Sequence, residues 1–131
     1  MAYAFNDDKS KFDFKKTWNT LTVVPHGTQI NSQSKVKYCV DPSGEVTLIG
    51  CIIFNGVTAL TDYFPIPSEL QPKSSADGGI NGRRDFGLFR TIYGNVCNIY
   101  IEHNNFYISF ETAPSYDDDE ITFEMSYNPT V

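Results

Sequence analysis

Short apolar segments that alternate with polar residues and end at turn residues dominate this chain. The segments are rich in Val, Ile, Thr, Tyr and Phe, which fit the pleated, half-buried surface of a sheet. Turn signals recur about every 8–12 residues, a spacing typical of an antiparallel sandwich or barrel. We expect strands at 21–24, 35–40, 45–54, 57–64, 86–93, 96–102, 106–111 and 120–127. The sequence therefore predicts an all-β, jelly-roll-like sandwich or barrel of about seven or eight strands.

The length of 131 residues fits a single domain. Residues 1–20 are expected to form an N-terminal arm with room for one helical turn. In this stretch Phe12, Phe14 and Trp18 follow neither a helical nor a clean alternating pattern. Residues 21–131 are expected to form the head domain.

A proline-rich stretch, "DYFPIPSELQPKSS" at 62–75, interrupts the strand pattern. Proline removes a backbone donor and fixes φ, so Pro65 and Pro67 should end the preceding strand. Strands flank the stretch on both sides. We therefore interpret it as a rigid crossover between two halves of one domain, and not as a linker or a docking peptide.

The hairpins after this crossover predict which side chains face the core. Two-residue loops at Gly94-Asn95 and Asn104-Asn105 would accept the positive φ that such turns need. The second loop sets Ile101 opposite Ile108 and Ile99 opposite Phe110. Three strands then agree on one apolar face, which indicates their register. This face collects Cys97, Ile99, Ile101, Phe106, Ile108, Phe110, Ile121, Phe123, Met125 and Tyr127.

The first loop gives a less regular strand at 86–93. It places Leu88 and Ile92 on the apolar face, but also Arg90, opposite Ile99. A bulge that shifts the strand would explain this, and so would a carboxylate partner for Arg90. The functional alternative is a charged group in a binding cleft.

The strand at 45–54 is apolar on both faces from Leu48 onward. A two-layer sandwich buries only one face of each sheet, so the second face needs a further cover. A symmetric partner subunit would supply that cover, and so would the N-terminal arm folding back.

The net charge of −6 argues against nucleic acid as a partner. The three cysteines, Cys39, Cys51 and Cys97, form no CxxC pair, so the sequence predicts neither a metal site nor a cofactor. A type I turn at "DPSG" (41–44) would place Cys39 near Val46 and Cys51 near Ser34. That separation is beyond disulfide reach, and we expect free thiols.

No run of 18 apolar residues is present, so we expect no membrane insertion. The first 16 residues carry charges where a signal peptide needs an apolar stretch. Together with the unpaired cysteines, this predicts folding in a reducing cytoplasm.

No catalytic motif stands out, and we expect a protein without enzymatic activity. His26 and His103 have no signature linking them to a nucleophile, and "GGINGRR" (78–84) precedes a strand instead of opening a helix. The acidic run "YDDDE" (116–120) lacks the spacing of a calcium loop. It also does not specify the carboxylate pair of a glycosidase. We interpret it as a solvated loop.

Candidate ligand-binding residues come from loop geometry. If successive strands run up and down, three loops share one end of the head. They carry Asn55, Tyr93, Asn95, Tyr116 and Asp117. Aromatic faces can cover sugar C–H groups while amides and carboxylates bind hydroxyls, so this composition suits saccharide recognition.

Four segments, taken in order, resemble a known family. They are "GEVTLIGCI", "FPIPSELQPKSS", "NVCNIYIEHNNFYISFE" and "ITFEMSY", and they cover roughly residues 44–128. This order is similar to that of the head domains of receptor-binding and baseplate proteins in long-tailed phages of Gram-positive bacteria. There an apolar strand leads to a proline phrase, then to hairpins with Asn or Gly tips and a final strand.

The resemblance implies a non-enzymatic phage tail or baseplate component that is made in the host cytoplasm and assembled into the virion tail. It implies other tail proteins as partners, a homotrimer, and host cell-wall saccharide as a ligand. The alternative is a purely structural or accessory virion assembly protein. A small glycan-active enzyme is a weaker alternative.

Overall fold

The computed structural model describes residues 3–6, 11–14, 16–23, 30–56, 60–73, 82–112 and 117–130. Their secondary structure is β apart from one short 3-10 turn, η1, at Ser68–Leu70. The strands are β1 (Tyr3–Asn6), β2 (Lys11–Phe14), β3 (Asn19–Leu21), β4 (Lys35–Val40), β5 (Val46–Phe54), β6 (Thr61–Pro65), β7 (Arg84–Arg90), β8 (Val96–Glu102), β9 (Asn105–Phe110) and β10 (Asp119–Tyr127).

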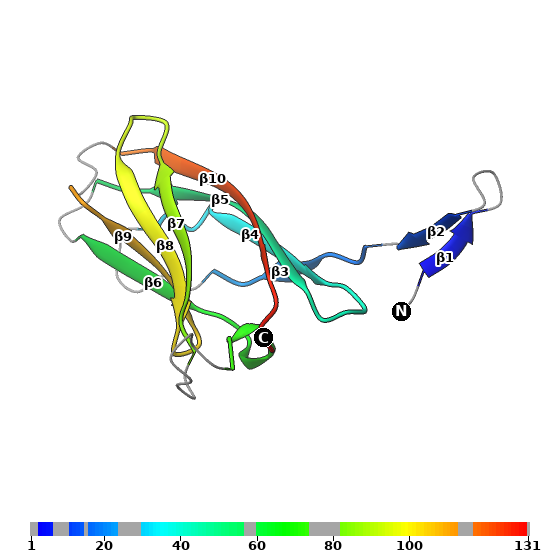
Figure 1. Cartoon of the computed structure of the whole chain (residues 1–131). Coiled ribbons are helices and arrows are strands. Elements are labelled where there is room, and N and C mark those ends of the chain that lie inside the picture. The colour runs from blue at the N-terminus through cyan, green and yellow to red at the C-terminus, as the bar shows by residue number, and fades with distance from the viewer. Residues whose placement is uncertain are drawn as a thin grey trace.

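Eight of these strands form two four-stranded antiparallel sheets, which together make the head (Figure 1). We call the sheet with order β10-β5-β4-β3 the front sheet, and the sheet with order β6-β9-β8-β7 the back sheet. The sheets are not closed, as in a sandwich. The predicted all-β sandwich of seven or eight strands is confirmed.

The core lies between the inner faces of the two sheets. Phe106 of the back sheet packs against Phe64 on the neighbouring strand, with ring centroids 4.9 Å apart. Phe106 also reaches Phe123 of the front sheet at 5.4 Å, and Phe54 meets Phe110 edge-on at 5.0 Å. All ten residues predicted to share the apolar face are buried.

The β8–β9 hairpin turns at His103 and Asn104, which both have positive φ (51° and 61°). The turn was predicted at Asn104-Asn105 and therefore lies one residue earlier than expected. As a result Ile101 lies opposite Phe106, and not opposite Ile108. The register error is two residues, and a shift of two leaves every side chain on its predicted face because the side-chain period is two.

The β7–β8 connection is a five-residue turn, Thr91–Asn95, instead of the predicted two-residue loop. Thr91 N donates to Asn95 O (2.9 Å), and Gly94 N donates to Thr91 O (2.9 Å). Gly94 has φ +86°, a conformation that glycine adopts without steric cost. Strand β7 consequently pairs three residues away from the expected register, with Arg90 opposite Val96.

The side-chain assignment for β7 was wrong for this reason. Leu88 and Ile92 are 68% and 60% exposed, and Arg90 is also exposed. Phe86 and Phe89 pack against the core instead. The register also shifts between Asp85 and Gly87. This bulge lies beyond Arg90 as counted from the turn, so it is the five-residue turn, and not the bulge, that places Arg90 outside the core.

The "DPSG" segment makes the same kind of five-residue turn as Thr91–Asn95. Gly44 N donates to Asp41 O and Asp41 N donates to Glu45 O, both at 2.9 Å. Cys39 therefore lies opposite Thr47 and Cys51 opposite Lys35, one residue from the predicted partners. The expectation for the cysteines holds, since all three are free thiols.

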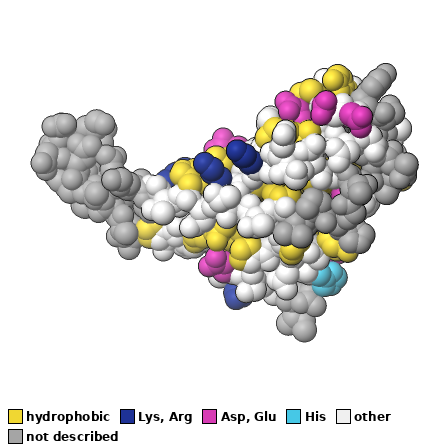
Figure 2. Space-filling view, turned by 180° about the vertical axis from the view of Figure 1, so that it is seen from behind, with side chains coloured by type: hydrophobic (Ala, Val, Ile, Leu, Met, Phe, Trp, Pro, Cys, Tyr) yellow, Lys and Arg dark blue, Asp and Glu magenta, His cyan; other side chains and the backbone are white. Residues whose placement is uncertain are grey.

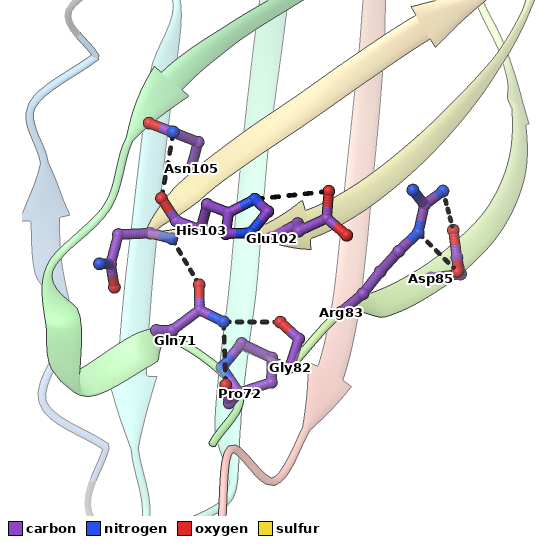
Figure 3. Close-up of polar contacts among 9 residues, drawn as sticks. Gln71, Pro72, Gly82, Arg83, Asp85, Glu102, His103 and Asn105 are labelled. Atoms are coloured by element: carbon purple, nitrogen blue, oxygen red, sulfur yellow. Dashed lines mark hydrogen bonds and ion pairs between the residues drawn. The ribbon is translucent and has the colours of Figure 1, made fainter. Parts of the chain in front are cut away.

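The proline-rich stretch leaves β6 at one edge of the back sheet and leads to β7 at the other edge. Along the way Ile66, Leu70 and Pro72 are buried. Gln71 fixes the path: its amide donates to Pro72 O (2.9 Å) and Gly82 O (2.6 Å), while its oxygen accepts from Asn104 N at 2.6 Å (Figure 3). The described part of the stretch, residues 62–73, therefore covers one end of the core.

The described residues of the N-terminal arm form strands apart from 16–18, which are irregular, so the expected helical turn is not found among them. Strands β1 and β2 pair in a hairpin that lies apart from the head (Figure 1). Strand β3 adds to the edge of the front sheet beside β4. The hairpin does not lie over the outer face of β5, the position expected if the arm covered that strand.

Candidate functional site at the distal end of the head

The end of the head away from the β1–β2 hairpin is called here the distal end (Figure 1). Strands β5, β7 and β9 end there, and β6, β8 and β10 begin there. The up-and-down arrangement expected from the sequence therefore places the three candidate loops together. The described loop residues at this end are 55–56, 60, 91–95, 111–112 and 117–118.

The buried carboxylate of Asp119 organises the distal end. Asp119 is 0% exposed, and its Oδ2 accepts hydrogen bonds from Thr91 Oγ1 (2.7 Å) and Asn95 Nδ2 (2.8 Å). Its Oδ1 accepts from the backbone N–H groups of Tyr93 (3.2 Å) and Glu120 (3.0 Å). Hydrogen bonds to charged groups are the stronger ones, so Asp119 holds the Thr91–Asn95 turn rigidly against β10.

A second contact ties this turn to the front sheet. Ile92 N donates to the carbonyl oxygen of Glu120 at 3.0 Å. Thr91 Oγ1 also accepts from Asn95 N at 3.0 Å, which closes the turn internally. The turn is thus fixed both to itself and to the opposite sheet.

Apolar side chains stand exposed on this fixed frame. Tyr93 is 55% exposed, Ile92 60% and Leu60 50%. Acidic residues lie in another loop at the same end, the one between β9 and β10, at Glu111, Asp117 and Asp118. Figure 2 shows acidic side chains gathered at the upper right of the head. An exposed aromatic ring beside carboxylates is a composition that can contact both the C–H and the hydroxyl groups of a sugar.

Asp117 contacts Gly56, the neighbour of Asn55 in the chain, where β5 ends and β10 begins. Asp117 Oδ1 accepts from Gly56 N at 2.5 Å, and the side chain of Asp117 is exposed. Asn55 Oδ1 accepts from Asn31 Nδ2 at 3.2 Å. Asp117 therefore sits on an anchored loop, while part of the Asn55 amide is committed to holding the segment around Asn31.

The predicted site residues differ in their exposure and in their hydrogen-bond partners. Tyr93 and Asp117 are exposed at the distal end, and Asn55 is half-buried beside Asp117. The side-chain amide of Asn95 is directed to Asp119 and has a structural role. Tyr116 lies outside the described residues.

Sequence reasoning missed Thr91 and Asp119. The signal available was the match between "TIYGN" and "DPSGE", which both place an oxygen-bearing side chain three residues before glycine. In the second turn Asp41 Oδ1 accepts from Ser43 N (2.8 Å) and Glu45 N (3.1 Å). The Thr91–Asn95 turn has the Thr91 hydroxyl at the equivalent place, and this hydroxyl also donates to Asp119.

A row of aromatic side chains crosses the outer face of the back sheet. Tyr100 stacks on Tyr107 with centroids 4.8 Å apart and an interplanar angle of 6°, and Tyr63 lies 5.1 Å from Tyr107. The Arg83 guanidinium covers the Tyr100 ring at 3.8 Å. These ring faces contact each other and Arg83, so they are already partly covered within the protein.

The Arg83 guanidinium is itself held by Asp85. Its two hydrogen bonds to the carboxylate measure 3.0 Å and 2.9 Å (Figure 3). These bonds lower the pKa of Asp85 below its ordinary value, because they stabilise the charged form. The pair holds the guanidinium over the face of the Tyr100 ring.

Among the described residues, no group of three or more His, Cys, Asp or Glu side chains is placed to hold a metal ion. The described residues also contain no helix long and apolar enough to cross a membrane. Burial, together with the nearby charge of Asp119, raises the pKa of the Cys97 thiol to about 12. Cys97 therefore stays protonated and unreactive at neutral pH.

No protein-family model matches the chain, and no curated protein or solved structure matches it either.

Proposed function

We propose that this chain is a non-enzymatic component of a phage tail or baseplate, and that its distal end binds saccharide of the host cell wall. The observation that carries the saccharide proposal is the exposed ring of Tyr93 on a turn held by Asp119, at the same end of the head as the exposed Asp117. The resemblance of residues 44–128 to receptor-binding heads supports the placement in a tail.

The mode of binding follows from the chemistry of the distal end. The Tyr93 ring would cover the C–H face of a sugar ring, and the Asp117 carboxylate would accept hydrogen bonds from its hydroxyl groups. The turn that carries Tyr93 is already ordered by the contacts of Asp119. Little conformational entropy would then be lost on binding.

Binding is favoured over hydrolysis because of Asp119. This carboxylate is fully buried, and both of its oxygens accept hydrogen bonds from the protein. It cannot reach a glycosidic bond without breaking the frame of the site. We therefore favour a saccharide-binding protein over a glycan-active enzyme.

The partners that fit this proposal are other tail proteins, with the chain made in the host cytoplasm and assembled into the virion tail. The alternative function is a structural or accessory assembly protein. It is favoured by the outer face of β5, where Ile49, Cys51 and Ile53 are only half-buried.

The saccharide proposal predicts the effect of Tyr93→Ala. We expect at least about tenfold weaker binding to purified Gram-positive cell-wall polysaccharide, since truncating an aromatic anchor commonly costs this much or more. Isothermal titration calorimetry against a panel of such polysaccharides measures the effect.

Leu88→Ala is the matched control, because Leu88 is also an exposed apolar residue of the β7 region but belongs to the strand and not to the distal turn. It should leave binding unchanged. Equal binding by the wild type and Tyr93→Ala would contradict the proposed site. Binding to no polysaccharide, combined with incorporation into tail particles, would favour the assembly role.

A further inference from the structure

The outer face of the front sheet carries an apolar stripe along its second strand. Ile49, Cys51 and Ile53 point outward from β5 and are half-buried. Ile49 and Cys51 border an open hollow of about 500 Å³, which is also lined by Lys35, Lys37, Gly50, Phe123 and Glu124. Apolar residues in the middle of a sheet face suggest a contact surface.

Charged side chains of opposite sign flank this stripe. The strand register puts Lys37, Ile49 and Glu124 in one row across the sheet. The next outward-facing row contains Lys35, Cys51 and Thr122. The β4 side of the stripe is therefore basic and the β10 side is acidic. Lys37 and Glu124 are separated by two strand spacings, roughly 9–10 Å between backbones.

The order basic, apolar, acidic is complementary to itself. When two copies of one face meet, the two-fold axis lies in the plane of the interface. An axis parallel to β5 places Lys37 over the partner's Glu124, and Ile49 over the partner's Ile49. An axis perpendicular to β5 would place lysines over lysines and glutamates over glutamates, and like charges in contact are strongly unfavourable.

We propose that two copies of this chain pair face to face through the outer side of the front sheet, about a two-fold axis parallel to β5. Ile49, Cys51 and Ile53 form the apolar centre of this interface. Lys37 and Glu124 form its charged border and set the orientation of the two copies. This pairing uses side chains of β4, β5 and β10 and none of the distal loop residues, so it does not depend on saccharide binding.

Charge reversal tests both the interface and its axis. Lys37→Glu places glutamate against the partner's Glu124 at two symmetric positions, and Glu124→Lys creates two lysine contacts. We expect each single variant to raise the dimer dissociation constant at least about tenfold. The double variant, Lys37→Glu with Glu124→Lys, restores opposite charges across the axis and should return close to the wild-type value.

Analytical ultracentrifugation over a range of protein concentrations measures these constants, with circular dichroism to confirm the fold. Both charged residues are exposed, so the variants should fold. Ile49→Asp should give a monomer, and Leu88→Asp, on the edge strand β7 of the other sheet, should remain a dimer. A wild type that is monomeric throughout, or trimeric by mass, would overturn the proposal. Failure of the double variant to recover dimerisation would overturn the axis.

Discussion

Gly50 shows how a single residue sets the packing between β5 and its neighbours. A Cβ atom at this position would lie 2.7 Å from Phe123 Cζ, 2.9 Å from the Lys35 carbonyl oxygen and 3.0 Å from Val36 Cγ2. Two of these neighbours belong to β4 and one to β10, so the absence of a side chain allows both strands to pack closely.

We expect Gly50→Ala to destabilise the protein by about 1–3 kcal/mol, the usual cost of overpacking a core. The carbonyl oxygen is backbone and cannot rotate away, so relaxation is restricted. Chemical denaturation would measure the loss. Gly56→Ala is the matched control, because its Cβ would meet only the Asp117 carboxylate, at 3.0 Å. An exposed side chain can move, so Gly56→Ala should cost clearly less, and equal losses would refute this explanation.

At the level of elements, the crossover after β6 depends on the final strand. Tyr127 of β10 donates its hydroxyl to the Leu70 carbonyl oxygen at 2.5 Å. Phe86 packs edge-on against the same tyrosine ring at 5.3 Å. The hydroxyl therefore fastens η1 to the front sheet, while the ring fills the core below it.

Tyr127→Phe should keep the ring packing but leave the Leu70 carbonyl oxygen buried without this donor. The expected loss is about 1–3 kcal/mol of unfolding free energy, and faster amide hydrogen exchange should be confined to the region around Leu70 and Gln71. Tyr107→Phe, on the outer face of the back sheet, provides the comparison and should have a small effect. Unchanged exchange around Leu70 in Tyr127→Phe would show that this bond does not anchor the crossover.

The eight strands of the head could be located from alternation, but their pairing could not, and strands β1 and β2 of the arm were missed. Faces were correct for β8 and β9 because the β8–β9 error was two residues, an even number, and for β10 because its side chains alternate regularly. They were wrong for β7 because its error was three and a bulge followed at Asp85 and Gly87. The difference arises in the turns, where the φ of Gly94 and His103 decides the loop length and no periodic pattern reports it.

The candidate site was predictable to a similar degree. Up-and-down strands brought Tyr93 and Asp117 to one end, as expected. The structural role of Asp119 could not be predicted from the sequence, since it is one of three consecutive aspartates with identical chemistry. Only the fold distinguishes the buried one from its exposed neighbours Asp117 and Asp118.

For the whole molecule, the buried groups Cys97 and Tyr127 predict a loss of stability in alkali. Burial raises the pKa of Cys97 from 9.0 to about 12, and raises that of Tyr127 above its ordinary 10.0. The folded chain thus keeps two protons that the unfolded chain releases. Their contribution to stability is complete below pH 9 and is lost progressively as the pH rises above it.

Each of the two groups should lower the unfolding free energy by about 1.4 kcal/mol per pH unit once the unfolded chain titrates. Urea denaturation between pH 8 and about pH 11 would give this slope. A double variant, Cys97→Ala with Tyr127→Phe, should show a flatter dependence even if it is less stable at pH 8. The same slope in wild type and variant would exclude these groups as the cause.

The pairing of β5 with β10 also has a consequence for how the chain is made. Strand β5 is translated well before β10, yet all nine residues of β10 pair with it. A nascent chain therefore exposes the apolar inner face of β5, and also Ile49, Cys51 and Ile53 on its outer face, before β10 has been synthesised. Unpaired apolar strands are prone to aggregate. The sandwich cannot close during synthesis until β10 has left the ribosome. Strand β10 also supplies the Asp119 carboxylate at one end of the core and the Tyr127 hydroxyl at the other.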